Sequence, residues 1–142
     1  KFHKKSTNIK DTWAHQVSSE IVKNHSYIAM EDLKIQNMTK SAKGTVEEPG
    51  TNVKAKSGLN HAILNQVWGK TGEYITYKGN AVGVPVVKVP APYTSQKCSE
   101  CGYVSKDNRQ TQASFVCQEC GHTENADINA AKNILTASYN LC

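Results

Sequence analysis

The sequence predicts an α/β fold that carries a four-cysteine zinc ribbon, and three observations lead to this prediction. Apolar residues recur at helical spacing over residues 1–24 and again from residue 59 onward. Short apolar runs at residues 27–30 and 82–89 have the length and composition of buried strands. Two Cys-x-x-Cys pairs then precede a last helical segment that starts near Asn125. Helices that alternate with buried strands are typical of an α/β sheet.

The three predicted helices are recognised by apolar residues on one face. These are Trp13, Val17, Ile21 and Val22 in the first helix, Leu59, Ile63, Leu64, Val67 and Trp68 in the second, and Ala130, Ala131, Ile134 and Leu135 in the last. The second helix is expected to continue to about Tyr77, although Gly69 and Gly72 weaken it.

The two predicted strands are short and are flanked by polar residues or prolines. Residues 27–30 run directly into Glu31, which indicates a buried strand that ends at this acid. Residues 82–89 are rich in β-branched side chains, and Pro85 indicates an edge position or an irregular start. Residues 34–58 are expected to form a flexible, lysine-rich loop, because their Gly, Ser, Thr and Asn content resists packing.

Charge and hydropathy limit the classes of function. The chain has 142 residues with 17 basic against 12 acidic ones, a net charge of +5, and all the basic residues except Arg109 are lysine. Lysine acts as a mobile point charge, so this surface favours contacts to a nucleic-acid backbone over base reading. Ordinary solubility explains the same charge equally well. No segment approaches the roughly 20 apolar residues of a membrane helix, and the basic start is not followed by the apolar run of a signal peptide.

Four of the five cysteines form two pairs, Cys98 with Cys101 and Cys117 with Cys120. Their C-x2-C-x15-C-x2-C spacing is typical of a zinc site, because two intervening residues let one turn direct both thiolates at one metal ion. A redox dithiol is the alternative interpretation. Because protein fills all four positions, the zinc is expected to be structural, with no open catalytic position.

The neighbours of the cysteines agree with a zinc ribbon. Gly102 and Gly121 follow the second cysteine of each pair, where a positive φ would free backbone N–H groups to reach sulfur. His122 is interpreted as a surface residue, because four thiolates already complete the metal shell. A secreted disulfide framework would show scattered spacings, so the cysteines indicate an intracellular, reducing compartment. The ribbon is expected to contact nucleic acid, to staple the fold, or to do both.

Two acidic residues stand at the ends of predicted elements. Glu31 ends the first strand, and Asp127 opens the last helix. Each has an ordinary explanation, since acids after strands are commonly solvated and acids at helix starts act as caps or as partners of the helix dipole. Carboxylates on rigid supports are also suited to hold Mg²⁺. Spacing alone therefore leaves both interpretations open.

Three blocks of sequence in a fixed order are specific in combination. They are residues 28–33 around Glu31, residues 93–102 with a serine-glutamine-x-cysteine block, and residues 124–134 with an aspartate-x-asparagine-alanine-alanine block. Together they closely resemble the C-terminal half of the TnpB (OrfB) family, transposon-encoded relatives of the miniature type V CRISPR nucleases. The similarity runs from about residue 10 to residue 136, which is nearly the whole chain.

The resemblance implies the C-terminal half of an RNase H-like (RuvC-like) α/β fold, with the zinc ribbon inserted before its last helix. Residues 1–92 would form the nuclease portion, residues 93–124 the ribbon and residues 125–142 the C-terminal helix. The resemblance also implies RNA-guided, metal-dependent cleavage of DNA, with a guide RNA and a target DNA as partners. A cytoplasmic location follows from this, at the nucleoid when DNA is bound.

The resemblance further implies three carboxylates that hold two Mg²⁺ ions. Glu31 matches the second of them and Asp127 the third, whereas Asp32 would point to the other face of the strand. Two hard cations about 4 Å apart clamp the attacking and leaving oxygens of a phosphodiester. Arg109 lies between the cysteine pairs and is expected either to contact nucleic acid near this site or to be a surface charge of the ribbon.

The first carboxylate of the family, an aspartate on the first strand of the fold, is expected in an N-terminal portion upstream of this chain. Asp11 does not match it, because Asp11 lies in a helical pattern. The chain alone is therefore expected not to cleave DNA. The alternative function is a non-catalytic zinc module that binds nucleic acid through its ribbon and lysine loop. A ribbon that makes only protein contacts is a third possibility, and it predicts no salt-dependent affinity for DNA or RNA.

Overall fold

The computed structural model of the chain describes residues 2–141, with side chains from Lys4 onward. It divides into two compact units, which we call the helical unit (residues 1–27 and 33–85) and the ribbon unit (residues 28–32 and 86–142). This division by compactness does not test the assignment of residues 1–92, 93–124 and 125–142 to nuclease and ribbon portions, which stays a prediction. No helix within residues 2–141 is long and apolar enough to cross a membrane.

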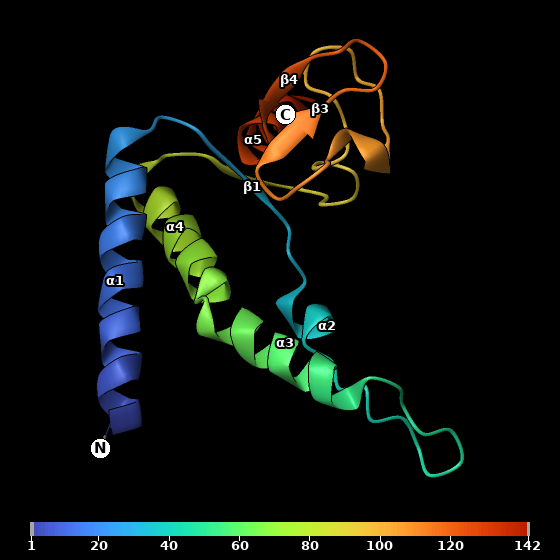
Figure 1. Cartoon of the computed structure of the whole chain (residues 1–142). Helices are drawn as coiled ribbons and strands as arrows, with labels where there is room; N and C mark the ends of the chain where they lie inside the picture. Colours follow the sequence, from blue (N-terminus) through green and yellow to red (C-terminus); the bar gives the residue numbers. More distant parts are fainter. Residues whose placement is uncertain (1, 142) are drawn as a thin grey trace. The chain divides into compact units, whose positions relative to one another are not determined.

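In the helical unit, α1 (Phe2–Asn24) packs along α4 (Trp68–Val82), as Figure 1 shows. The first helix was predicted correctly, but of the apolar residues named on it only Val22 is buried. Ala14, Ser18 and Val22 are buried, whereas Trp13 is 52% exposed. Small side chains at i, i+4 and i+8 let two helices approach closely, so the buried stripe lies one position beyond the apolar stripe that the sequence suggests.

Polar contacts join α1 to α4 along the same face. The Lys78 ammonium donates to the Ser18 hydroxyl at 2.8 Å and to the backbone carbonyl of His15 at 2.6 Å. Nearer the start of α4, the Asp11 carboxylate accepts hydrogen bonds of 2.7 Å from the Lys70 ammonium and the Tyr74 hydroxyl. The hydrogen bond from Lys70 lowers the pKa of Asp11 most, followed by that from Tyr74.

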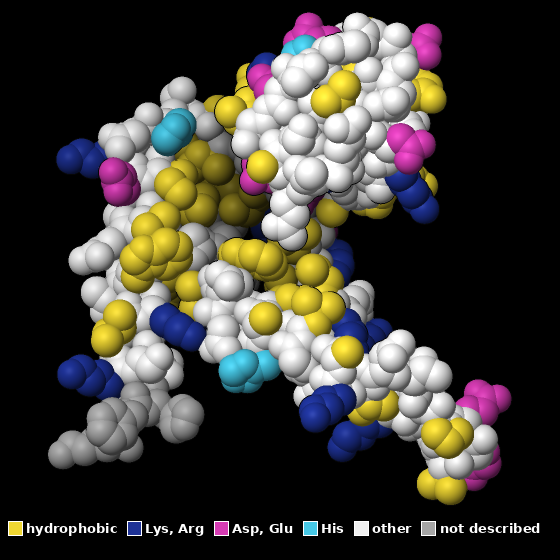
Figure 2. Space-filling view, viewed as in Figure 1, with side chains coloured by type: hydrophobic (Ala, Val, Ile, Leu, Met, Phe, Trp, Pro, Cys, Tyr) yellow, Lys and Arg dark blue, Asp and Glu magenta, His cyan; other side chains and the backbone are white. Residues whose placement is uncertain are grey.

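The prediction of a flexible loop over residues 34–58 is wrong, because this stretch contains helical structure. A short helix, α2 (Ile35–Met38), follows the first strand, and α3 (Val53–Asn65) begins six residues earlier than expected. Asn60 donates a 2.8 Å hydrogen bond to the Thr39 carbonyl, which ties α3 to the end of α2. Lysines favour helix formation but contribute no apolar stripe. A prediction from apolar periodicity therefore misses the first six residues of α3. Figure 2 shows lysine side chains gathered on this part of the helical unit.

The second predicted helix is in fact two helices. The chain breaks between α3 and α4 at Val67, which has a positive φ of 52°. The α4 helix then continues to Val82, so the predicted strand over residues 82–89 shortens to β2 (Val86–Val89). Gly83, with φ of 76°, caps α4, and this glycine was the available signal for a helix end.

The ribbon unit contains two small sheets (Figure 1). The strand β1 (Ile28–Glu31) pairs in parallel with β2, and Glu31 lies opposite Val89 in the register. The connection from β1 to β2 passes through three helices of the helical unit, as a parallel pair requires a long crossover. The prediction of a strand that ends at Glu31 is confirmed, with a start one residue later, but only Ile28 of this strand is buried and the other three residues are half-buried.

The second sheet pairs β3 (Ser114–Val116) with β4 (Thr123–Asn125) in antiparallel orientation. A single 3₁₀ turn, η1 (Lys106–Asn108), precedes β3, and α5 (Ala126–Tyr139) follows β4 directly. The core of this unit is formed by Cys98, Phe115, Cys117 and Ala126. The last helix starts where the sequence predicts it, because the Asn125 side chain accepts from the backbone N–H of Asp127 and caps the helix.

Candidate functional site

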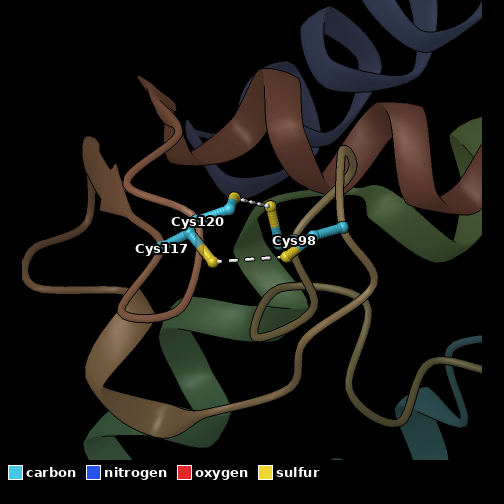
Figure 3. A group of neighbouring side chains, drawn as sticks. Cys98, Cys117 and Cys120 are labelled. Atoms are coloured by element: carbon cyan, nitrogen blue, oxygen red, sulfur yellow. Dashed lines mark hydrogen bonds between the residues drawn. The ribbon is translucent and has the colours of Figure 1, made fainter.

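The four cysteines predicted to bind zinc come together in the ribbon unit. Their sulfur atoms all lie within 4.8 Å of one another, and Figure 3 shows three of them labelled. The Cys98 and Cys120 sulfurs are 3.8 Å apart, and those of Cys101 and Cys117 are 3.6 Å apart. A tetrahedron with metal–sulfur bonds of about 2.3 Å has sulfurs about 3.8 Å apart. The spacing therefore fits a tetrahedral metal site.

Two turns of the same design hold these sulfurs. In the first, the backbone N–H of Cys98 donates to the Tyr103 carbonyl and that of Gly102 donates to the Cys98 carbonyl. In the second, Cys117 and Gly121 repeat this pattern, with the His122 carbonyl as the first acceptor. Both glycines have the expected positive φ, 78° and 73°. Any residue with a Cβ is strained at such a φ, which explains the glycine after each pair.

The thiols differ in how readily they lose a proton. The pKa of Cys117 is lowered to about 6, chiefly by the backbone N–H of Cys120 and also by that of Glu119. The backbone of Tyr103 lowers the pKa of Cys101 too, but burial and the neighbouring thiols raise it to about 12. Four thiolates this close repel one another, so a bound cation is needed before all four ionise together.

Glu31 and Asp127 line one cleft of ≈ 400 Å³ within the ribbon unit, together with Arg109. The remaining lining is mostly small: Ala91, Thr94, Ser95, Ala130, Ala131 and Ile134. Asp127, Ala130, Ala131 and Ile134 share one face of α5 at i, i+3, i+4 and i+7. Alanines on that face leave the space in front of the acids open.

Glu31 reaches this cleft from the last position of β1. The Thr94 hydroxyl donates to one carboxylate oxygen of Glu31 across 2.5 Å. Thr94 itself is buried, at 8% exposure. Because the donor is fixed by burial, the hydrogen bond fixes the orientation of the Glu31 carboxylate as well.

Asp127 reaches the cleft from the first turn of α5, and 81% of its side chain is exposed. The Arg109 guanidinium lies 3.2 Å from one oxygen of this carboxylate and also donates to the Gln112 carbonyl at 2.9 Å. Both interpretations of Arg109 were open from the sequence. The structure places its side chain at the cleft beside Asp127.

The sequence reasoning missed three buried asparagines that hold the ribbon unit together. Asn129 accepts from the Ser99 N–H at 2.9 Å and donates to the Lys97 carbonyl at 2.8 Å. Asn133, one turn further along α5, donates to the carbonyls of Thr94 and Lys97. Asn108 makes similar bonds, with Gln96, Tyr103 and Gln118 as its partners. For Asn129 and Asn133, their i and i+4 spacing on the predicted last helix was the available signal.

The sequence is similar to a family model and to proteins of known name. Residues 68–134 match the model of the family described as Cas12f1-like, TNB domain. The chain is 48% identical to the Escherichia coli (strain K12) protein named "Putative RNA-guided DNA endonuclease InsQ", over 98% of this chain and 35% of that protein. It is 37% identical to "CRISPR-associated endodeoxyribonuclease Cas12f1" of Sulfoacidibacillus thermotolerans, over 92% of this chain and 28% of that one. The chain thus spans about a third of the length of these relatives.

Solved structures share the fold. A Cas12f1 chain from a complex with single-guide RNA and target DNA superposes with a TM-score of 0.63 at 24% identity, over 93% of this chain and 35% of that chain. A CRISPR–Cas12f ternary complex gives a TM-score of 0.58 at 24% identity, over 94% and 25%. With the sequence matches, these similarities confirm the resemblance inferred from the three sequence blocks. We conclude that the chain belongs to the TnpB family and is related to the miniature type V proteins named Cas12f1.

Proposed function

We propose that this chain forms the C-terminal nuclease portion of an RNA-guided, metal-dependent DNA endonuclease of transposon origin. The observation that carries the proposal is that Glu31 and Asp127, far apart in the sequence, line the same cleft with Arg109. We further propose that the α/β elements belong to an RNase H-like (RuvC-like) fold into which residues 93–124 are inserted as a zinc ribbon. The names of the relatives support the same activity for the longer proteins that contain this region.

Two kinds of metal fit the residues of the ribbon unit. Four thiolates at tetrahedral spacing suit a structural Zn²⁺, whereas the carboxylate oxygens of Glu31 and Asp127 suit Mg²⁺. Two carboxylates leave coordination positions for water, for phosphate oxygens and for the further aspartate that the family resemblance places upstream. When bound, two Mg²⁺ ions would supply the positive charge that stabilises the attacking and leaving oxygens of a phosphodiester.

Arg109 is assigned to the substrate phosphate. Its planar guanidinium offers paired N–H donors that match phosphate oxygens. The ion pair with Asp127 and the bond to the Gln112 carbonyl hold the guanidinium at the cleft. Guide RNA and target DNA would be the partners, and the lysines of the chain suit contacts to their backbones.

The metal assignment is tested by Mn²⁺ binding to the zinc-loaded chain, measured by electron paramagnetic resonance. Glu31→Gln and Asp127→Asn should each weaken Mn²⁺ binding by at least about tenfold, since each removes a charged ligand. Asp107→Asn is the matched control, because Asp107 is an exposed acid of the ribbon that does not line the cleft. Equal Mn²⁺ affinity in all four proteins would remove the basis for the magnesium site.

Cleavage separates the nuclease from the alternative binding module. In the complete RNA-guided protein that contains this chain, Asp127→Asn should abolish cutting of target DNA and leave target binding intact. A binding module needs neither acid, so the same substitution would leave its affinity unchanged or slightly raised, because a negative charge is lost beside the phosphates. Retained cutting by the Asp127→Asn protein would contradict the proposed catalytic role.

A further inference from the structure

We propose that Thr94 is a positioning residue for Glu31, and that the Asn129–Asn133 pair of α5 holds Thr94 in place. This assignment rests on the proposed function, because it concerns how a metal-binding carboxylate is oriented. It explains two parts of the sequence that the zinc site and the carboxylates leave without a role. These are the threonine before the serine-glutamine block and the two asparagines one helical turn apart.

The first step is the contact between Thr94 and Glu31. The Thr94 oxygen lies 2.5 Å from one oxygen of the Glu31 carboxylate and 2.9 Å from the Ala91 carbonyl. A hydroxyl has one proton to donate, and an ionised carboxylate is the stronger acceptor. Because the Ala91 carbonyl is also within reach, the fold does not need Glu31 to satisfy this hydroxyl. The bond therefore serves the carboxylate: it engages one oxygen and fixes the plane of the group.

The second step is the way in which Thr94 is held. Its side chain is buried, and its own carbonyl accepts a 2.9 Å hydrogen bond from the Asn133 amide. The same amide donates to the Lys97 carbonyl at 2.7 Å, and Asn129 donates to that carbonyl at 2.8 Å. Both asparagines are buried, so these bonds do not compete with water. The turn from residue 94 to residue 97 is thus fixed to α5.

The consequence is a connection between the two acids of the cleft. Asp127 stands on one face of α5, and Asn129 and Asn133 stand on nearly the opposite face of the same helix. From Asn133 the connection passes through the Thr94 carbonyl and hydroxyl to Glu31. A metal site requires its ligands to be held within about 0.5 Å of the productive geometry. Side chains that orient a ligand commonly change metal affinity by about 10- to 100-fold when they are removed.

The test compares Thr94→Val with Thr94→Ser. Valine has the shape of threonine without the hydroxyl, and serine keeps the hydroxyl. Mn²⁺ affinity of the zinc-loaded chain is measured by electron paramagnetic resonance, together with zinc content and the midpoint of thermal unfolding. We expect Thr94→Val to weaken Mn²⁺ binding about tenfold, with full zinc content, and Thr94→Ser to restore most of the affinity. Thr136→Val is the control, because Thr136 is exposed on α5 and does not line the cleft.

The outcomes separate failure of the Thr94 positioning role from failure of the proposed metal site. Wild-type Mn²⁺ affinity in Thr94→Val would overturn the positioning role, as would a Thr94→Ser protein that is folded and zinc-loaded but binds as weakly as Thr94→Val. A Thr94→Val protein that loses zinc or unfolds early would assign the residue to the fold, and this too would overturn the proposal. If Glu31→Gln binds Mn²⁺ as the wild type does, the proposed metal site itself fails, whatever Thr94 does.

Discussion

The ribbon unit and the helical unit are stabilised by different kinds of interaction. The ribbon unit buries Phe115 fully, places four sulfurs around one point and pairs buried amides with backbone carbonyls. The helical unit buries mainly small side chains between α1 and α4, and leaves both of its tryptophans half exposed. Hydrogen bonds from Lys70, Tyr74 and Lys78 also cross that face, and they are exposed or only partly buried. The cleft that we propose for metal-dependent chemistry is lined by residues of the ribbon unit.

This difference between the units predicts where single substitutions should affect stability most. Buried polar groups are costly when they lose a partner, whereas exposed pairs contribute about 0–1 kcal/mol. The ribbon unit is also too small to be stabilised by apolar burial alone, and small domains are commonly stabilised by a bound metal ion. Equivalent changes should therefore have large effects in the ribbon unit and small effects in the helical unit.

Loss of the proposed zinc ion should have the largest effect. Structural zinc in small domains contributes about 10 kcal/mol or more of binding free energy at neutral pH. Chelation, or Cys117→Ser, should remove hydrogen-exchange protection from the amides of Cys98 and Gly121, whose partners lie in the two cysteine turns. The α1 amides should keep theirs. Hydrogen exchange followed by mass spectrometry resolves both units in one experiment.

The control for this experiment is Cys142→Ser. Cys142 is the fifth cysteine of the sequence, outside both Cys-x-x-Cys pairs, and it lies outside the described residues. The Cys142→Ser substitution should leave the zinc content and the hydrogen-exchange protection unchanged. Simultaneous loss of protection in α1 and in the ribbon unit after chelation would mean that the two units unfold together, and the comparison would fail.

The sequence predicted more of the ribbon unit than of the helical unit. In the ribbon unit, ligand spacing and capping chemistry are local, so the cysteine cluster, the two glycines and the start of α5 follow from residues a few positions apart. The cleft could be anticipated only through the family resemblance. Its geometry depends on Glu31 and Asp127, which the fold brings together from distant positions, and no local pattern encodes that distance.

In the helical unit, apolar periodicity was a weaker guide. It found α1 and the buried Val22, but it missed Ala14 and Ser18 and wrongly included Trp13. Small side chains such as Ala14 and Ser18 fit a close helix contact, whereas a tryptophan does not. It merged α3 with α4, because the break at Val67 requires a positive φ that β-branched residues rarely adopt. Tertiary packing overrides local preference at such positions.

Removal of a buried amide should have an intermediate effect. Asn129→Ala leaves the Ser99 N–H and the Lys97 carbonyl each with one partner fewer, so we expect a loss of about 2–4 kcal/mol in the free energy of unfolding of the ribbon unit. The same change at Asn8, exposed on α1, is the matched control in the other unit. It should change stability by less than about 0.5 kcal/mol, because only helix propensity is altered. Urea unfolding measures both, and equal losses would contradict the contrast between the units.

The smallest effect is expected from Asp11→Asn in the helical unit. The hydrogen bond from Lys70, then that from Tyr74, lowers the pKa of Asp11, and Asp11 in turn raises the pKa of both partners. A lowered carboxyl pKa contributes stability above the unfolded value of 3.8, and this contribution is lost as the pH falls through the folded value. The raised pKa of Lys70 contributes below its unfolded value of 10.5 and is lost as the pH rises through the folded value.

The difference in urea midpoint between wild type and Asp11→Asn should therefore be constant from about pH 5 to pH 9 and shrink toward pH 3. Zinc release at low pH affects both proteins alike, so the difference between them isolates the carboxylate. A pH-independent difference would mean that Asp11 acts through shape and not through charge. A difference as large as that of Asn129→Ala would mean that the polar face between α1 and α4 is as fixed as the ribbon unit.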